Sequence, residues 1–152
     1  QRQMCIRDSR YTFDLSDSQM IAVFSQADHE VTREEISNWL KKDDDPAFRD
    51  CNDTKMAIFL NGFINKRRGK REGAQPKPET RLNNNIIFTK LKIALNLKAE
   101  EIIELLALAG FHIGKHELSA FFRRPDHKHY RECKDQILRN FLKGVQLKFR
   151  EG

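Results

Sequence analysis

The chain has 152 residues, in which 28 lysines and arginines outnumber 22 aspartates and glutamates, and its isoelectric point is near 9.3. No segment approaches the roughly 20 apolar residues that cross a bilayer, and no charged start followed by an apolar run indicates a secretory signal. The three cysteines, at positions 5, 51 and 133, form neither a paired framework nor a close-spaced metal motif, which is typical of a reducing compartment. We therefore predict a cytoplasmic protein with no membrane partner.

The first nine residues, QRQMCIRDS, resemble translated adapter sequence rather than a native protein start. We interpret residues 1–9 as a non-native segment and leave them out of functional inference. Because most of these side chains are polar, we expect any helix that they form to be frayed or poorly packed.

Three helices are predicted between residues 10 and 69. Ser16 with Gln19, and Thr32 with Glu35, form two capping boxes, each followed by apolar residues at helical spacing. A turn at residues 43–46 precedes a longer helix that ends near a glycine. The residues expected to face the core of these helices include Met20, Phe24, Ile36, Trp39, Met56, Phe59, Leu60 and Phe63.

A segment rich in glycine, proline and charge follows, and we assign residues 70–82 to a linker. Three asparagines at positions 83–85 offer caps for the next helix. Further helices are predicted over residues 100–109, 115–124 and 133–149. Strand signals, such as alternating β-branched residues and Asn-Gly hairpins, are absent from the sequence.

The chain matches itself without a gap when it is shifted by 82 positions, from Arg10–Arg68 onto Lys92–Arg150. This duplication predicts an all-α fold of two tandem helical repeats, residues 10–69 and 83–150, with about four helices each. The identical pairs are Leu15/Leu97, Ile21/Ile103, Ala27/Ala109, Glu35/Glu117, Ser37/Ser119, Asp44/Asp126, Arg49/Arg131, Cys51/Cys133, Asp53/Asp135, Phe59/Phe141, Leu60/Leu142, Gly62/Gly144, Lys66/Lys148 and Arg68/Arg150. The predicted core comprises Phe24, Trp39, Phe59, Leu60, Leu106, Phe121, Phe141 and Leu142.

The second repeat contains the segments LKIALNL, LALAGF, ELSAFFRRPDHKHYREC and DQILRNFLKGVQ. With these segments the chain resembles, over about residues 10–150, the YehS-like family of bacterial proteins, in which a domain of unknown function occurs twice. The most specific positions are Tyr130, Arg131, Cys133, Asp135, Gln136, Leu138, Arg139, Asn140, Phe141, Leu142 and Gly144. The resemblance implies a duplicated, all-helical, cytoplasmic bacterial protein, and it implies no known activity, substrate or cofactor.

Positive charge is concentrated in the second half of the chain. Residues 10–69 carry 9 Lys/Arg and 11 Asp/Glu, whereas residues 70–90 carry 5 and 2, and residues 91–150 carry 12 and 7. Basic side chains interleaved with aromatic and imidazole rings are typical of surfaces that neutralise phosphates and stack on bases. We predict an RNA or DNA interface formed by Lys66, Arg67, Arg68, Lys70, Arg71, Arg123, Arg124, Lys128 and Arg131.

Catalytic and metal sites are not predicted. The second repeat holds four histidines and Cys133, but the equivalent positions of the first repeat are Glu30, Glu34, Asp45, Ala47 and Cys51, so no metal site is common to both. No phosphate-cradling glycine loop and no set of nucleophile, base and orienting group is present. We therefore predict a protein that is not an enzyme and has no cofactor.

Two features leave alternatives open. The duplicated apolar grooves could instead take an amphipathic helix of a partner protein, and the oligomeric state is not indicated. The arginine of the Arg49/Arg131 pair is duplicated in step with core positions. We expect it to hold its loop to a neighbouring helix through a carboxylate or free carbonyls rather than to recognise a ligand.

Overall fold

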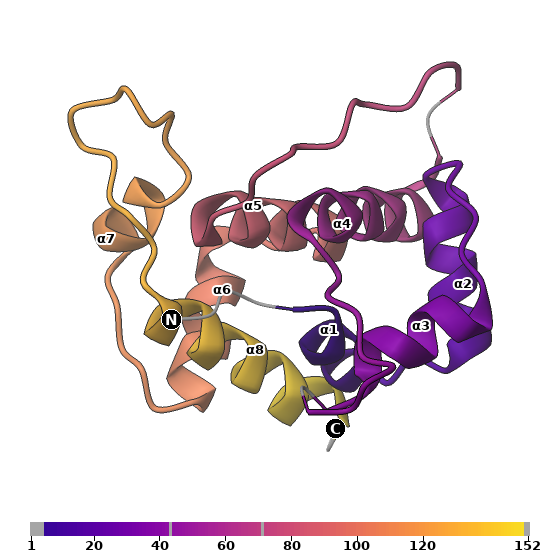
Figure 1. Cartoon of the computed structure of the whole chain (residues 1–152). Helices are drawn as coiled ribbons and strands as arrows, with labels where there is room; N and C mark the ends of the chain where they lie inside the picture. The colour runs from indigo at the N-terminus through magenta and orange to yellow at the C-terminus, as the bar shows by residue number, and fades with distance from the viewer. Residues whose placement is uncertain (1–4, 43, 71, 151–152) are drawn as a thin grey trace. The chain divides into compact units, whose positions relative to one another are not determined.

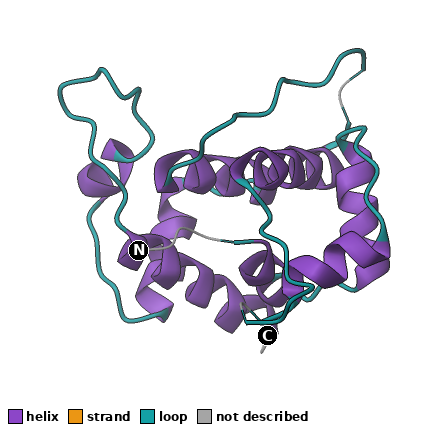
Figure 2. Cartoon of the chain, in the orientation of Figure 1, coloured by secondary structure: helices purple, strands orange, loops and turns teal. Residues whose placement is uncertain are grey.

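A computed structural model describes residues 5–42, 44–70 and 72–150, and these residues contain eight helices and no strand (Figures 1 and 2). None of the described helices is long and apolar enough to cross a bilayer. One compact unit runs from Cys5 to Leu82, and a second begins at Asn83. The first contains α1 (Ile6–Thr12), α2 (Asp17–Gln26), α3 (Arg33–Leu40) and α4 (Asp53–Arg68), and the second contains α5 (Asn84–Leu95), α6 (Ala99–Leu108), α7 (Lys115–Ala120) and α8 (Asp135–Arg150).

The helix boundaries repeat at the same offset as the sequence. Helices α2 and α6 coincide when shifted by 82 positions, and so do α4 and α8. The all-α, duplicated fold that the sequence predicted is therefore confirmed. Two boundaries were wrong by two residues or more: the helix predicted over residues 115–124 ends at Ala120, and the helix predicted over residues 133–149 begins at Asp135. The chain turns after Ala120, and the Phe122 N–H donates to the Ser119 carbonyl at 3.1 Å. This turn leaves Phe121 buried.

Each unit has an aromatic core. All eight predicted core residues are buried, with exposed fractions of 7% or less. In the first unit the Phe24 ring lies 5.6 Å from Trp39 and 5.5 Å from Phe59, measured between centroids. In the second, Phe88 lies 4.9 Å from Phe141. Tilted ring pairs at these separations add to the free energy gained from burying apolar area.

A glycine marks the closest helix crossing of each unit. A Cβ atom added to Gly62 in α4 would lie 2.0 Å from the Val23 carbonyl oxygen in α2. A Cβ atom added to Gly144 in α8 would lie 2.0 Å from the Leu105 carbonyl oxygen in α6. Because real Cβ atoms do not approach backbone oxygens so closely, both crossings require glycine. This contact explains why the Gly62/Gly144 pair is identical.

The helix starts differ between the units. In the first unit the side-chain oxygens of Ser16, Thr32 and Asn52 accept backbone N–H bonds of 3.2, 3.1 and 2.9 Å at the starts of α2, α3 and α4. The equivalent residues of the second unit are Lys98, Gly114 and Lys134. Lysine and glycine side chains offer no acceptor, so these helix starts lack that bond.

The other half of the capping box is kept in both units. Glu35 accepts the Thr32 N–H at 3.0 Å, and Glu117 accepts the Gly114 N–H at 3.1 Å. Glu101 likewise accepts the Lys98 N–H at 2.8 Å. The identical acids Glu35 and Glu117 are thus explained by capping, as the sequence pattern indicated.

The described part of the first nine residues is packed. Ile6 and Ser9 are buried, at 2% and 0% exposure, and the Arg7 guanidinium donates to the Leu40 and Lys41 carbonyls at 3.2 and 2.7 Å. The expectation of a frayed helix is therefore wrong for residues 5–9, because Ile6 supplies an apolar anchor within a mostly polar segment. Ser9 Oγ is buried without a hydrogen-bond partner among the described residues. Residues 1–4 lie outside the described residues.

Candidate nucleic-acid interface

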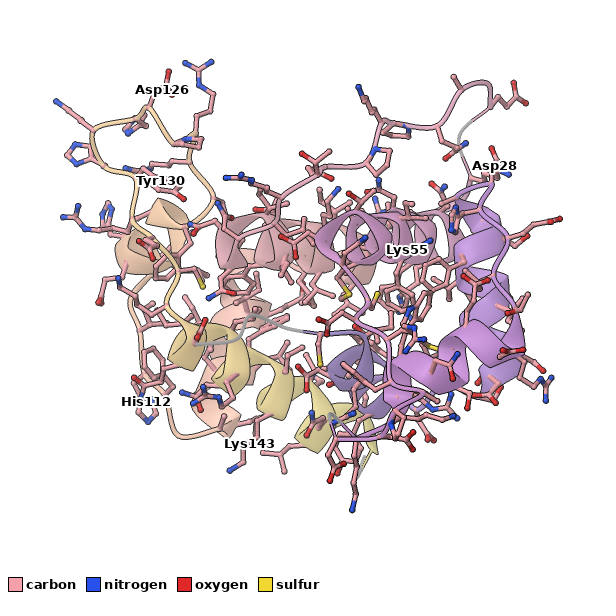
Figure 3. The ribbon with its side chains drawn as sticks, in the orientation of Figure 1. Asp28, Lys55, His112, Asp126, Tyr130 and Lys143 are labelled. Carbon is pink, nitrogen blue, oxygen red and sulfur yellow. The ribbon has the colours of Figure 1, made fainter. Side chains whose placement is uncertain are left out.

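The segment of residues 123–131, which we call the basic loop, follows α7 and carries four of the predicted site residues. Figure 3 labels Asp126 and Tyr130 on it. Its backbone bonds run from the His127 N–H to the Arg124 carbonyl, from Tyr130 to His127 and from Arg131 to Ala120, at 2.9, 3.0 and 3.1 Å. The same three bonds occur 82 residues earlier, over residues 38–49, at 3.0, 2.9 and 3.1 Å. The two loops therefore share a backbone and differ in their side chains.

Two asparagines in the first turn of α5 anchor the basic loop. The Asn85 amide nitrogen donates to the carbonyls of Phe121 and Arg131 at 3.0 and 2.8 Å, and its oxygen accepts the Cys133 N–H at 2.9 Å. The Asn84 amide nitrogen donates to the Cys133 carbonyl at 3.1 Å. These bonds satisfy backbone groups at both ends of the loop, and three of the four bonds are buried, so they fix its geometry.

The sequence pattern of residues 83–85 predicts helix capping, and it gives no direct sign of this anchoring role. Asn83 alone supplies the cap, since its side chain accepts the Ile86 N–H at 2.9 Å. The sequence signal for this role is that three asparagines occur in a row where one would be enough for a cap. One asparagine suffices as a cap, and asparagine is a poor residue inside a helix unless its side chain has another partner.

A pocket of about 640 Å³ lies between α7, the basic loop and the start of α8, and we call it the α7 pocket. Arg123 and Arg131 line it together with two histidines, so the fold brings together two of the predicted site residues. The Arg123 guanidinium is 3.4 Å from Ser119 Oγ, and no hydrogen bond joins the Arg131 guanidinium to another described residue. The complete lining is Phe111, Ile113, His116, Glu117, Ala120, Phe121, Arg123, His129, Arg131, Glu132 and Ile137.

The equivalent positions of the first unit differ in chemistry. Lys41 and Arg49 keep the positive charge of Arg123 and Arg131, but Glu34 and Ala47 stand where the second unit has His116 and His129. The Arg49 guanidinium donates to the Pro46 and Phe48 carbonyls at 3.2 and 2.7 Å. These carbonyls belong to its own loop, so the expectation that the guanidinium ties the loop to a neighbouring helix is wrong. The tie to the neighbouring helix comes from its backbone N–H, which donates to Asn38.

The other two predicted site residues of the basic loop, Arg124 and Lys128, are exposed. Arg124 Nε lies 3.5 Å from Asp126 Oδ1, with side-chain exposures of 87% and 75%. An ion pair so exposed contributes little free energy, so it leaves Arg124 available to a phosphate. Lys128 is also exposed.

The other predicted site residues belong to the first unit. Lys66, Arg67 and Arg68 are exposed in the last turn of α4, where their charge is favourable at the negative end of the helix dipole. Lys70 forms an ion pair with Asp28, which Figure 3 labels. Arg71 lies outside the described residues.

Two of the three cysteines have unreactive thiols. Burial raises the pKa of Cys51 and of Cys133 to about 12, so both remain protonated and poorly nucleophilic near neutral pH. Within the described part of the chain, no three His, Cys, Asp or Glu residues gather in a way that could hold a metal ion. His127 and His129 do lie together, with ring centroids 5.6 Å apart, and the His129 N–H donates to His127 Nδ1 at 3.0 Å.

Comparison with known proteins establishes the family. A family model described as "Protein of unknown function (DUF1456)" matches the chain twice, over residues 4–69 and 84–151. The chain belongs to this family. It is 40% identical over 141 residues to the "Uncharacterized protein YehS" of Escherichia coli strain K12, an alignment that covers 92% of this chain and 90% of the relative. The resemblance inferred from the sequence is thus confirmed. No solved structure matches the chain.

Proposed function

We propose that this protein is a non-catalytic nucleic-acid-binding module whose second unit contacts phosphates through the basic loop. The observation that carries the proposal is the convergence of Arg123 and Arg131 on one pocket beside the exposed Arg124 and Lys128. Arginine guanidinium groups match the geometry of phosphate oxygens, and exposed cations release counterions when they bind a nucleic acid. Lys66, Arg67 and Arg68 would supply further phosphate contacts from the first unit.

The placement of charge at helix starts supports the proposal. Lys98 and Lys134 occupy positions where the first unit has the capping residues Ser16 and Asn52. A cation at a helix N-terminus faces the positive end of the helix dipole and cannot accept the free N–H bonds. Local stability therefore does not explain these lysines, whereas attraction of a polyanion does.

The experiment is fluorescence anisotropy with a labelled single-stranded RNA at several salt concentrations. The test variant is Arg123→Glu with Arg124→Glu. The matched control is Lys41→Glu with Lys42→Glu, because these lysines hold the equivalent positions of the first unit and the change in net charge is the same. We expect the test variant to lose binding and the control to keep most of it. The affinity of the unmodified protein should fall with salt at a log-log slope of about −0.7 for each phosphate neutralised.

Two outcomes would overturn the proposal. One is the absence of binding to RNA or DNA at low salt. The other is an equal loss in both double variants, which would indicate only the effect of net charge. A thermal melt of each variant shows whether the fold is kept.

The second candidate function is binding of an amphipathic helix from a partner protein. One observation favours it: Leu108, on α6, is 52% exposed beside a hollow of about 410 Å³ that Leu105, Ala107 and Lys148 also line. An apolar side chain next to a concave surface is typical of grooves that accept a helix. A partner protein that remains bound after nuclease treatment, and is lost on Leu108→Asp, would favour this function over nucleic-acid binding.

A further inference from the structure

We infer that the α7 pocket lodges a single unstacked base, with the adjoining phosphate held by Arg123 and Arg131. This inference rests on the proposed function and narrows its ligand to single-stranded nucleic acid. Its starting point is the size of the pocket. A volume of about 640 Å³ lies within the range of about 300–1,000 Å³ that ligand pockets span.

The lining of the pocket is suited to a ligand that combines an aromatic ring with a negatively charged group. Phe111 and Phe121 give it apolar aromatic walls, and His116 and His129 add planar rings on which a base can stack. An inorganic anion alone would make little use of the aromatic walls, and an uncharged ring could stack on an arginine but would leave the positive charge of both arginines unpaired. A nucleotide uses both.

The pocket also contains two acidic side chains. Glu117 Oε1 accepts the Gly114 N–H at 3.1 Å, and Glu132 Oε1 lies 3.6 Å from Lys134 Nζ. Their remaining lone pairs can accept the amino and imino protons of a base edge, as carboxylates do with cytosine. The two acids thus offer acceptors to a base.

The pocket is held open by the protein itself. Asn85 bonds to the backbone of Phe121 on one wall and of Arg131 on another, at 3.0 and 2.8 Å. Because these bonds fix the backbone of both walls, little backbone entropy is lost when a ligand enters. The first unit has Glu34 and Ala47 in place of the two pocket histidines, and Arg49 is bonded to its own loop. We therefore assign the base site to the second unit only.

A duplex cannot use such a pocket without rearrangement. A base in a duplex must be unpaired and unstacked before it can enter, which costs a few kcal/mol. A single strand presents unstacked bases at little cost. The protein should therefore bind a single strand more tightly than the duplex of the same sequence.

The experiment compares three fluorescent 12-nucleotide probes on the full chain: a single strand, its duplex and an abasic strand that keeps every phosphate. We expect the single strand to bind at least tenfold more tightly than either of the others. Stacking energies predict that Phe111→Ala weakens single-strand binding by about fivefold to a hundredfold and leaves abasic binding unchanged. Phe149→Ala is the matched control, since this exposed aromatic of the same unit does not line the pocket.

A second pair of variants tests the phosphate contact. Arg131→Gln should weaken both the abasic and the native single strand, whereas Arg49→Gln, at the equivalent position of the first unit, should weaken neither. A melt of each variant checks its fold. If the Phe111→Ala variant does not fold, the comparison of the three probes on the unmodified protein still tests the base site.

The outcomes separate this inference from the proposed function. Equal affinity for the abasic strand, or for the duplex, would overturn the base site and leave phosphate binding standing. No binding of any probe would overturn both. Displacement of the single strand by polyglutamate at equal charge concentration would also overturn both, because it would identify an acidic polypeptide as the ligand.

Discussion

In the first unit, Arg7 ties α1 to the loop after α3 through the Leu40 and Lys41 carbonyls, whereas in the second unit Asn84 and Asn85 hold the corresponding loop. The two loops have the same backbone bonds. One backbone is thus stabilised by different side chains in the two units. The bounds of two helix pairs, the glycine crossings and the aromatic cores are shared, while caps, loop anchors and surface charge differ. The shared features account for the fold, and the differing ones are where a function specific to one unit can lie.

The largest effect should come from removing the equivalent core aromatic from each unit, which tests whether the two cores are alike. Phe59 and Phe141 occupy equivalent positions and are both 0% exposed. Phe59→Ala and Phe141→Ala should each lower the free energy of unfolding by about 3–5 kcal/mol, because truncation leaves a cavity. Chemical denaturation of each variant measures this loss. A melt left unchanged by either substitution would show that the aromatic core of that unit is misassigned.

The glycine crossings give the next largest effect. Gly144→Ala and Gly62→Ala each place a Cβ atom where a backbone oxygen lies 2.0 Å away. We expect each to destabilise by about 3 kcal/mol, the upper end of the usual range for overpacking, since a helix backbone yields less readily than a side chain. Gly114→Ala is a control for the loss of a glycine, as its φ is −87° and its added Cβ would meet only a flexible side-chain oxygen, Glu117 Oε1, at 3.4 Å. Stabilities that fall equally in all three variants would refute the close crossing.

The loop anchors can be tested by Asn85→Leu. This change leaves the Phe121 carbonyl and the Cys133 N–H without their partner in a buried setting, at a cost of about 1–3 kcal/mol. The Cys133 amide should also lose protection in hydrogen exchange. Asn83→Ala, which removes only the cap of α5, should destabilise without exposing that amide. Unchanged protection of Cys133 in Asn85→Leu would contradict the anchoring role.

Much of this comparison could be predicted from the sequence, because the repeat acts as an internal alignment. Positions such as Phe59/Phe141 and Gly62/Gly144 are identical since each meets the same neighbours in its own unit. The end of α7 at Ala120 could not be predicted, because the apolar pattern continues through Phe121 and Phe122 while the backbone turns, which buries Phe121 and leaves Phe122 half-buried.

The candidate site was predicted only in part. Charge clustering indicated Arg123 and Arg131, but charge does not show that two arginines line one pocket. Their convergence depends on long-range bonds, chiefly those of Asn85 to residues 36 and 46 positions away. The packing of Ile6 was missed for the same reason, since a single apolar residue in a polar segment gives no periodic signal.

The smallest expected effect distinguishes the units at a single helix start. Ser16 caps α2, and Lys98 stands at the equivalent start of α6 without a side-chain acceptor. Ser16→Lys should destabilise the protein by about 1 kcal/mol, and Lys98→Ser should stabilise it by a similar amount. Both follow from denaturation midpoints at constant ionic strength. The two changes alter net charge in opposite directions, and a shift that tracked charge alone would fade in high salt, whereas a capping bond persists. If the Lys98→Ser variant is more stable but binds RNA more weakly, Lys98 contributes to binding at a cost in helix stability. If the variant is more stable and binds RNA with unchanged affinity, Lys98 is not part of the binding surface.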